Sequence, residues 1–299
     1  MTLVVVGSAG MDTVETPFGR VEDAVGGSAV YFSLAASLFT KVQIAANIGQ
    51  DYPRRVWDFL QHERGADLAG VRTFADQPSF RWSGRYEGDM NSAQTLLTEL
   101  NVLAEPPTPP ASYRGAPFVF LANMGPDVQL RMLEDLDGGT VFADTMNLWI
   151  EIQGSALLEL MKRIDGLILN DGEARALTGE TNLIRAGEDL LEMGPRLAVV
   201  KKGEHGAFLF TRDFHFALPA YPVREVVDPT GAGDSFAGGF VGHLAACGSL
   251  EPDALRKAMA YGTVAASCTV ERFSTEGLEL ANRAQLDARL AELRSFISL

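Results

Sequence analysis

One stretch of the sequence, Val226–His243 (VVDPTGAGDSFAGGFVGH), places a carboxylate directly after a glycine-rich turn. We expect an apolar strand to end before this turn and a helix of small residues to follow over Ser235–Ala246. Gly231, Ala232 and Gly233 would then lie at the helix N-terminus, where backbone N–H groups are free. Free N–H groups and the positive end of the helix dipole together form a site for an anion.

Asp234 belongs to the same helix start. A carboxylate in this position can accept a proton from a hydroxyl group while the N–H groups hold a migrating phosphoryl group. The structural alternative is that Asp234 only caps the helix and that the glycines only allow close helix packing. A glycine-rich turn alone leaves these two interpretations about equally plausible.

The elements that must hold this turn in place alternate along the chain. Apolar stripes with helical spacing cover Ser28–Phe39 and Gln285–Leu299. This alternation with short apolar runs predicts an α/β fold, in which helices cover both faces of a mostly parallel sheet. Ligands of such folds bind at the carboxyl ends of the strands. The predicted buried strands are Leu3–Val6, Gln43–Ala46, Phe118–Leu121, Thr140–Ala143, Gly166–Leu169 and Leu197–Val200.

Two segments, Asp12–Val25 and Ser79–Val102, break this pattern because polar and apolar residues alternate along them. Such alternation is typical of antiparallel strands with one solvent-exposed face. We expect a small β-sheet lid with strands within about residues 12–25 and 79–103. A stiff proline-rich connector, Glu105–Pro110, would lead back to the core. The chain would form one domain over residues 1–299.

Composition limits the classes of function. Of the 299 residues, 46% are hydrophobic and 21% are charged, which is enough for a large core without disulfides or structural metals. The net charge of −14 argues against a nucleic-acid-binding face, and no apolar run is long enough for a membrane span. Without a signal-peptide pattern or a CxxC pair, we expect a cytoplasmic protein. The dinucleotide fingerprint GxGxxG is also missing after the first strand.

The string GAGDSFAGGF closely resembles the C-terminal signature of the ribokinase-like, or PfkB, family of carbohydrate and nucleoside kinases. The resemblance implies a ribokinase-like three-layer α/β/α core with a small β-sheet lid. It also implies transfer of the γ-phosphoryl group of ATP, with Mg²⁺, to a hydroxyl group of a sugar or a nucleoside. Further motifs of the family follow in its order along nearly the whole chain, at Gly26–Gly27, Gly49–Asp51, Asn170–Glu173 and Val200–Ala207.

On the acceptor side, the resemblance implies that Asp234 is the catalytic base and that the three residues before it hold the γ-phosphoryl group. Asp12 would bind substrate hydroxyl groups. Gly26 and Gly27 would let the backbone approach the substrate and let the lid hinge. Each assignment has a structural alternative, since Asp12 could start a turn and the glycine pair could be an ordinary strand-to-helix turn.

On the nucleotide side, the resemblance implies that Asn170 and Glu173 position Mg²⁺, with Glu173 acting through water, and that Lys201 and Gly203 contact ATP. Asp228 would hold a monovalent cation such as K⁺ beside the anion hole. The structural alternatives are a helix capping box for Asn170 and Glu173 and a solvated turn for Lys201. Asp228 could likewise be only a turn residue before a proline.

The lid is expected to select the acceptor. Its aromatic rings could stack on a nucleobase, or form a dry face against the core or a second lid. Tyr31 stands where sugar-specific relatives have Asn, and the lid sequence resembles bacterial nucleoside kinases of the family, so we slightly favour a nucleoside. We expect a homodimer through the lids. The alternative function is a non-catalytic small-molecule-binding or regulatory protein on the same fold. The lid residues behind these expectations are Phe80, Arg81, Trp82, Arg85 and Tyr86.

Overall fold

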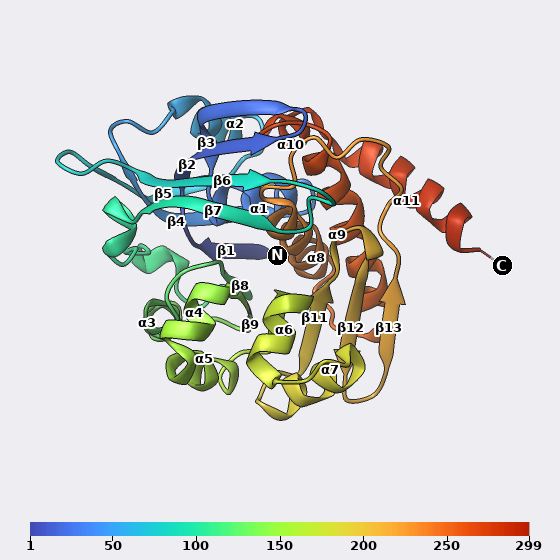
Figure 1. Cartoon of the computed structure of the whole chain (residues 1–299). Coiled ribbons are helices and arrows are strands. Elements are labelled where there is room, and N and C mark those ends of the chain that lie inside the picture. The colour runs from blue at the N-terminus through green and yellow to red at the C-terminus, as the bar shows by residue number, and fades with distance from the viewer. Residues whose placement is uncertain (299) are drawn as a thin grey trace.

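The computed structural model describes residues 1–298, and within this range the chain forms two β-sheets (Figure 1). The larger sheet runs in the order β13-β12-β11-β10-β9-β8-β1-β4-β5. Its strands pair in parallel except at one edge. There β12 pairs antiparallel with both of its neighbours, β11 and β13. The strands are β1 (Thr2–Val6), β4 (Lys41–Gly49), β5 (Asp67–Phe74), β8 (Phe118–Leu121), β9 (Thr140–Asp144), β10 (Gly166–Asn170), β11 (Leu197–Lys201), β12 (Ala207–Thr211) and β13 (His215–Leu218).

Helices cover both faces of the large sheet, which gives three layers. Successive residues of a strand point to opposite faces. In β1, Leu3 and Val5 belong to one buried apolar cluster, whereas Val4 and Val6 belong to another. The first cluster packs under α1 (Ser28–Ala36), α2 (Arg54–His62), α8 (Ala232–Cys247), α9 (Pro252–Val270), α10 (Glu276–Leu280) and α11 (Arg283–Ile297). The second packs under α3 (Pro126–Leu136), α4 (Asn147–Ile152), α5 (Gly154–Met161), α6 (Asp171–Thr178) and α7 (Leu183–Glu192).

The smaller sheet is the lid, and it lies across the carboxyl-end side of the core in Figure 1. Its strand order is β3-β2-β6-β7, with β2 and β6 parallel and the outer pairs antiparallel. β2 continues the chain from β1, so the lid is attached directly to a core strand. The lid strands are β2 (Gly10–Thr16), β3 (Gly19–Gly26), β6 (Phe80–Tyr86) and β7 (Ala93–Glu99).

The structure confirms the α/β/α core with its lid and all six predicted core strands, most of which extend a residue or more further. The apolar patterns did not predict β5 or the antiparallel edge formed by β12 and β13. The connector Glu105–Pro110 contains no helix or strand. Within residues 1–298, no helix has both the length and the apolar character needed to cross a membrane.

The start of α8 differs from the sequence prediction in a way that affects the site. α8 begins at Ala232, three residues before the predicted start at Ser235. Gly231 precedes it with a left-handed φ of 75°, a conformation that glycine adopts at little steric cost. This turn directs the chain into the helix early, so that Asp234 becomes the third residue of α8.

Candidate active site

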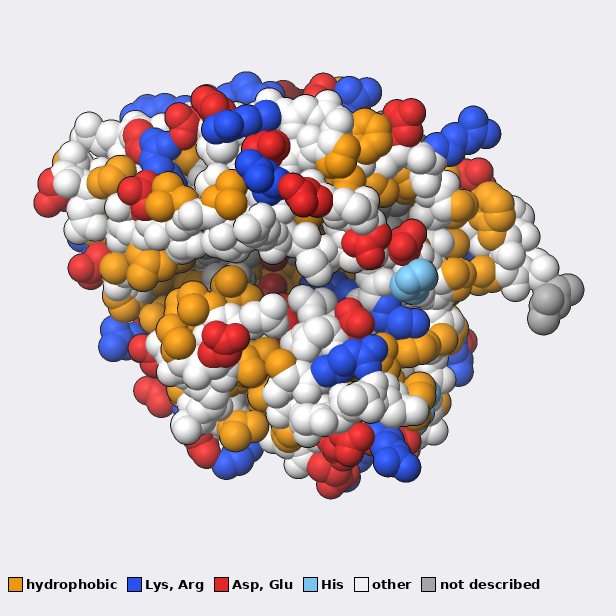
Figure 2. All heavy atoms as spheres, viewed as in Figure 1, with side chains coloured by type: hydrophobic (Ala, Val, Ile, Leu, Met, Phe, Trp, Pro, Cys, Tyr) orange, Lys and Arg blue, Asp and Glu red, His pale blue; other side chains and the backbone are white. Residues whose placement is uncertain are grey.

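A hollow separates the lid from the core, and acidic atoms are visible at its floor in Figure 2. The core wall of this hollow is built from the carboxyl ends of β9, β10 and β11, together with the N-terminus of α8. These positions bring Asp144, Asn170 and Lys201, each the last residue of its strand, to one edge of the sheet. This is the edge at which parallel α/β sheets bind ligands.

The N-terminus of α8 supplies backbone donors beside Asp234. Among residues 1–298, the N–H groups of Gly231 and Gly233 donate no hydrogen bond, whereas the Ser235 N–H donates to the Gly231 carbonyl at 2.9 Å. The Ala232 N–H also donates, to the Pro229 carbonyl at 3.1 Å. The prediction of three free N–H groups is therefore corrected to two, because the Ala232 N–H forms a hydrogen bond within the tight turn before α8.

Gly231 also meets a steric requirement of the site. A Cβ atom on Gly231 would collide with the ring of Tyr31, which is 1% exposed and lies on α1. The two elements can approach this closely only because the turn before α8 has no side chain there. Tyr31 is therefore packed against the backbone of the turn before α8. From the sequence we expected only that Tyr31 would replace an Asn near the acceptor.

Lys201 is the cation of this site. Its Nζ atom lies 2.6 Å from the position that a Cβ of Gly233 would occupy. Its positive charge acts to lower the pKa of Asp234, of Asp144 and of Glu173. Among residues 1–298 it forms no ion pair within 4.0 Å. An ammonium group held between three acids and a helix N-terminus can bind the phosphate groups of an anionic ligand.

The two acids of the acceptor side have different pKa values. Although part of Asp234 opens to the hollow, burial among protein atoms raises its pKa to about 6, and the Lys201 charge limits this rise. Burial raises the pKa of Asp12 to about 8, with further contributions from the Asp228 and Asp234 charges. At neutral pH, Asp234 is therefore mostly ionised while Asp12 is mostly protonated.

Asp12 lies in β2 and its carboxylate has no hydrogen-bond partner within residues 1–298, although the residue is only 6% exposed. Its carboxylate rests against Gly26 in β3, where a Cβ atom would collide with it. Gly27 follows as the residue before α1, with a φ of 106°. The predicted acceptor residues are therefore in contact with one another, and Asp12 retains its capacity to bind hydroxyl groups.

Asn170 and Glu173 form the capping box at the start of α6. The Glu173 N–H donates to Asn170 Oδ1 at 2.8 Å, and the Asn170 N–H donates to Glu173 Oε2 at 2.7 Å. Burial raises the pKa of Glu173, and the Lys201 charge opposes this rise. The capping box is thus confirmed for this pair, and the capping hydrogen bond uses only one of the two Glu173 carboxylate oxygens.

Asp144 is a member of the site that the sequence analysis did not assign. It is 5% exposed, and its Oδ1 atom is buried without a hydrogen-bond partner. Burial raises its pKa well above the usual range, and the Asp234 charge adds to this effect. The available signal was its place in the string DTMNLW, directly after an apolar strand.

Asp144 and Glu173 fit a divalent cation such as Mg²⁺, which prefers oxygen ligands and usually binds one or two carboxylates together with phosphate groups. The unpartnered Asp144 Oδ1 atom is the observation that supports this fit. Within residues 1–298, no group of three or more His, Cys, Asp or Glu side chains is arranged to hold a metal ion alone. Nucleotide phosphates and water would therefore complete such a site.

Asp228 has structural partners on both of its oxygens. Oδ1 accepts a hydrogen bond from the Thr230 N–H at 2.9 Å, and Oδ2 accepts one from the Ser274 N–H at 3.1 Å. Asp228 is 1% exposed and links the turn before α8 to the loop after α9. The interpretation of Asp228 as a turn residue is therefore supported.

The lid touches the core on both sides of the hollow. Tyr86, at the end of β6, lies with its hydroxyl group 3.3 Å from Thr230 Oγ1 in the turn before α8. At the lid tip, Asn91 Nδ2 donates to Glu204 Oε1 at 3.4 Å, and Asn91 also contacts Gly203 in the loop after β11. The lid therefore spans from the anion hole to the loop predicted to contact the nucleotide.

The aromatic lid residues adopt different positions. Phe80 packs on Gly10 of β2, and Trp82 lies across Gly84 with its Nε1 3.2 Å from Thr95 Oγ1. Trp82 pairs in register with Asp12, and strand alternation places Tyr86 on the same face. Trp82 and Tyr86 thus lie on the lid face that carries the acceptor carboxylate.

Comparison with known proteins agrees with this architecture. A cytidine kinase of Thermococcus kodakarensis is 31% identical over 248 residues, which cover 81% of this chain and 87% of that protein. The structure of a Methanocaldococcus jannaschii nucleoside kinase, described as an archaeal member of the ribokinase family, has a TM-score of 0.78 at 18% identity, covering 97% of this chain and 98% of the other.

A Salmonella enterica aminoimidazole riboside kinase, solved with aminoimidazole riboside and an ATP analogue, has a TM-score of 0.76 at 21% identity. The alignment covers 97% of this chain and 100% of that kinase. At these identities the two structures establish the fold. Residues 135–280 match the sequence profile described as pfkB family carbohydrate kinase. With this profile and a 31% identical relative aligned over most of both chains, the protein belongs to the pfkB family of carbohydrate kinases.

Proposed function

We propose that this sugar or nucleoside kinase transfers the γ-phosphoryl group of ATP to a hydroxyl group of a nucleoside, with Asp234 as the catalytic base. The observation that carries the proposal is the position of Asp234 in the first turn of α8. There it lies beside two free backbone N–H groups, and its charge is close enough to Asp12 to raise the pKa of that acid.

The pKa values support Asp234, rather than Asp12, as the base. A general base works best when its pKa lies near the working pH and it is ionised before reaction. Asp234 meets this condition with a pKa of about 6, whereas Asp12, with a pKa of about 8, enters the reaction protonated. Asp12 would then orient the acceptor by hydrogen bonding, and Asp234 would accept the proton of the reacting hydroxyl group.

The nucleotide would lie between the anion hole and the loop after β11. Lys201 and the N–H groups of Gly231 and Gly233 would bind the phosphate oxygens of ATP, and Gly203 would border the nucleotide. Asp144 and Glu173 would hold Mg²⁺ with Asn170 orienting Glu173. Bound Mg²⁺ neutralises charge on the phosphate oxygens. Positioning and charge neutralisation account for most of the catalysis of phosphoryl transfer.

A nucleoside acceptor is supported by the aromatic lining of the hollow. Tyr31 packs on the anion-hole turn, and Trp82 and Tyr86 share the lid face with Asp12. Rings placed near a site for ribose hydroxyl groups can stack on a base of any identity. The similar kinases are named as a cytidine kinase, a nucleoside kinase and an aminoimidazole riboside kinase, and these names support the same class of acceptor.

The experiment that tests the proposal measures ADP formation with Mg²⁺, ATP and a panel of nucleosides and sugars. We expect turnover with a nucleoside, and we expect Asp234→Asn to fold normally but to lose about 10²–10⁴-fold in kcat. Near wild-type turnover by this variant would show that Asp234 is not the base. Binding without turnover across the panel would favour a non-catalytic binding protein, and turnover only with sugars would refute the nucleoside assignment.

Three further proposals concern the surroundings of the reaction. Asp228 could bind K⁺ through lone pairs not used by Thr230 and Ser274, because it is buried beside the anion hole. We also propose a cytoplasmic location, where ATP is abundant.

Finally, we propose a homodimer through the lids, because Leu96 and Leu97 of the edge strand β7 are 48% and 51% exposed.

A further inference from the structure

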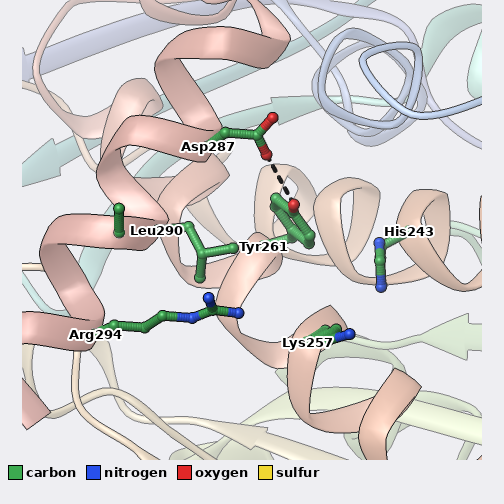
Figure 3. A pocket seen from close by; sticks show the side chains of 7 residues that line it. His243, Lys257, Tyr261, Asp287, Leu290 and Arg294 are labelled. Carbon is green, nitrogen blue, oxygen red and sulfur yellow. Dashed lines mark hydrogen bonds between the residues drawn. The ribbon is translucent and has the colours of Figure 1, made fainter. Parts of the chain in front are cut away.

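A second hollow lies away from the lid, on the surface formed by α8, α9 and α11 (Figure 3). Its volume is about 360 Å³, within the range of about 300–1,000 Å³ typical of small-molecule sites. His243 follows Asp234 by nine residues on α8, so it lies about 13.5 Å further along the helix axis. The hollow is therefore separate from the candidate active site. The side chains that define it are His243, Lys257, Tyr261, Asp287, Leu290 and Arg294.

The charged side chains of this hollow leave it with excess positive charge. Within residues 1–298, neither Lys257 nor Arg294 forms an ion pair within 4.0 Å. The single carboxylate, Asp287, is already engaged, because its Oδ1 accepts from Tyr261 Oη at 2.8 Å and from Arg283 Nε at 3.0 Å. The hollow therefore holds two cations with no ion-pair partner beside one engaged carboxylate, in a chain whose net charge is −14.

His243 lies within the field of these positive charges. Its ring is packed against Tyr261, with ring centroids 4.8 Å apart. Burial lowers the pKa of His243, and the charges of Arg283 and Lys257 lower it further. The charged groups that surround this ring come from α9 and α11, namely Lys257, Arg283 and Asp287, so His243 is mostly neutral at pH 7.

The remaining lining is apolar. Leu290 is 7% exposed and Tyr261 is 8% exposed, and in Figure 3 both lie between Arg294 and His243. A ligand in this hollow would meet cationic groups at the rim of the hollow and an apolar surface beneath these groups. A bare cation-binding role is excluded by the sign of the charges, and an uncharged ligand would leave Lys257 and Arg294 unmatched.

We propose that this hollow binds a small organic anion, whose phosphate or carboxylate group pairs with Lys257 and Arg294 and whose carbon skeleton packs on Leu290. Such a ligand would bridge three helices that meet at the end of α8. Because a ligand that binds only the folded state stabilises it, binding would also raise the melting temperature. The proposal concerns binding alone and does not depend on the kinase reaction.

The test follows the four histidines of the full chain by NMR while pH is varied, with and without three probes at millimolar concentration. The probes are inorganic phosphate, ribose 5-phosphate and citrate, which separate a phosphate preference from a carboxylate preference. An anion close to His243 favours its charged form, so at least one probe should raise the pKa of His243 by about half a unit or more. His62 and His215 serve as internal controls, whereas His205, in the loop after β11, reports anions that bind in the candidate active site instead.

The matched variants locate the effect. In Lys257→Ala/Arg294→Ala, the probe-induced shift of His243 should disappear, together with the associated rise in melting temperature. Arg131→Ala removes one positive charge from an exposed position on α3 and should retain the shift. The proposal is wrong if none of the probes shifts His243 in the unmodified protein, or if the double variant retains the full shift.

Discussion

Asp234 and Asp12 lie close enough to influence one another, yet their pKa values differ because their surroundings differ. Lys201 stabilises the ionised form of Asp234, whereas Asp12 has no cation among the causes of its pKa shift. The contrast is the physical basis of the proposal that Asp234 is the base and that Asp12 orients the acceptor. The protein achieves this contrast with a single lysine at the end of β11.

The pH dependence of the reaction tests this separation. Because Asp234 must be ionised to accept a proton and its pKa is about 6, kcat/KM should fall about tenfold per pH unit below pH 6. It should approach a plateau as pH rises above 6. The measurement is kcat/KM for the acceptor between pH 4.5 and 8 at saturating Mg²⁺ and ATP, with circular dichroism to verify folding. A rate that stays constant down to pH 5 would contradict the assignment.

Gly26 tests whether the position of Asp12 matters. In Gly26→Ala, the new Cβ atom would collide with the Asp12 carboxylate and displace it. Misplacement of a positioning group by about 1 Å can cost about 10²-fold, so we expect kcat/KM for the acceptor to fall at least about tenfold. Gly154→Ala is the matched control, since nothing lies within 4 Å of its added Cβ atom. Equal activity of the two variants would show that the Asp12–Gly26 contact is not needed.

Among the secondary-structure elements, α6 combines two tasks at its N-terminus. Its capping box holds the first turn, and the same Glu173 carboxylate lies in the field of Lys201. The sequence analysis left these two tasks as alternatives. The structure shows the cap, and the charged surroundings make a second task compatible with it, because a carboxylate can accept several hydrogen bonds or ligands at once.

Glu173→Gln separates the two tasks. The amide oxygen can still accept a hydrogen bond from the Asn170 N–H, so the free energy of unfolding should change by less than about 1 kcal/mol. Loss of the charge should raise the Mg²⁺ concentration needed for half-maximal activity by about 10–100-fold. Glu188→Gln, on the exposed side of α7, is the control for a general charge effect. An unchanged Mg²⁺ requirement would leave Glu173 with only its capping role.

For the molecule as a whole, β7 is the lid strand least covered by the rest of the chain. All seven residues of β7 are exposed, and this strand forms the free edge of the lid sheet. An exposed apolar edge strand favours pairing with another strand. The lid also contacts the core at both Thr230 and Glu204, so association through the lids would act on the element that spans the hollow.

Leu97→Lys tests association through the lids. A charge on the exposed edge should disfavour burial of β7 and shift the protein towards the monomer. Light scattering at micromolar concentration should give twice the mass of one chain for the unmodified protein and the mass of one chain for the variant. Leu280→Lys, at an exposed leucine of α10, should remain dimeric. A monomeric unmodified protein would refute the dimer.

Features that depend on neighbours in the chain were predictable from the sequence. The glycine turn, the helix after it and the position of Asp234 all lie within one short string, so local conformational rules place them together. The six core strands were likewise predictable because each is a continuous apolar run. The strands β5 and β13 were not, because their residues are only partly buried and carry a weaker pattern. β12 also escaped prediction, although four of its five residues are buried.

Long-range contacts were decided by the tertiary structure. Asp144, Glu173 and Lys201 come from different strands and helices, and only the parallel order of β9, β10 and β11 brings them into one field. The same applies to the hydrogen bond that occupies the Ala232 N–H, to the Tyr31 ring against Gly231, and to the lid contacts across the hollow. The string GAGDSFAGGF therefore indicated the type of reaction through its resemblance to the family signature, and local geometry placed Asp234 at the helix start. The protonation states and the shape of the acceptor site arise from packing between distant segments, which no local pattern records.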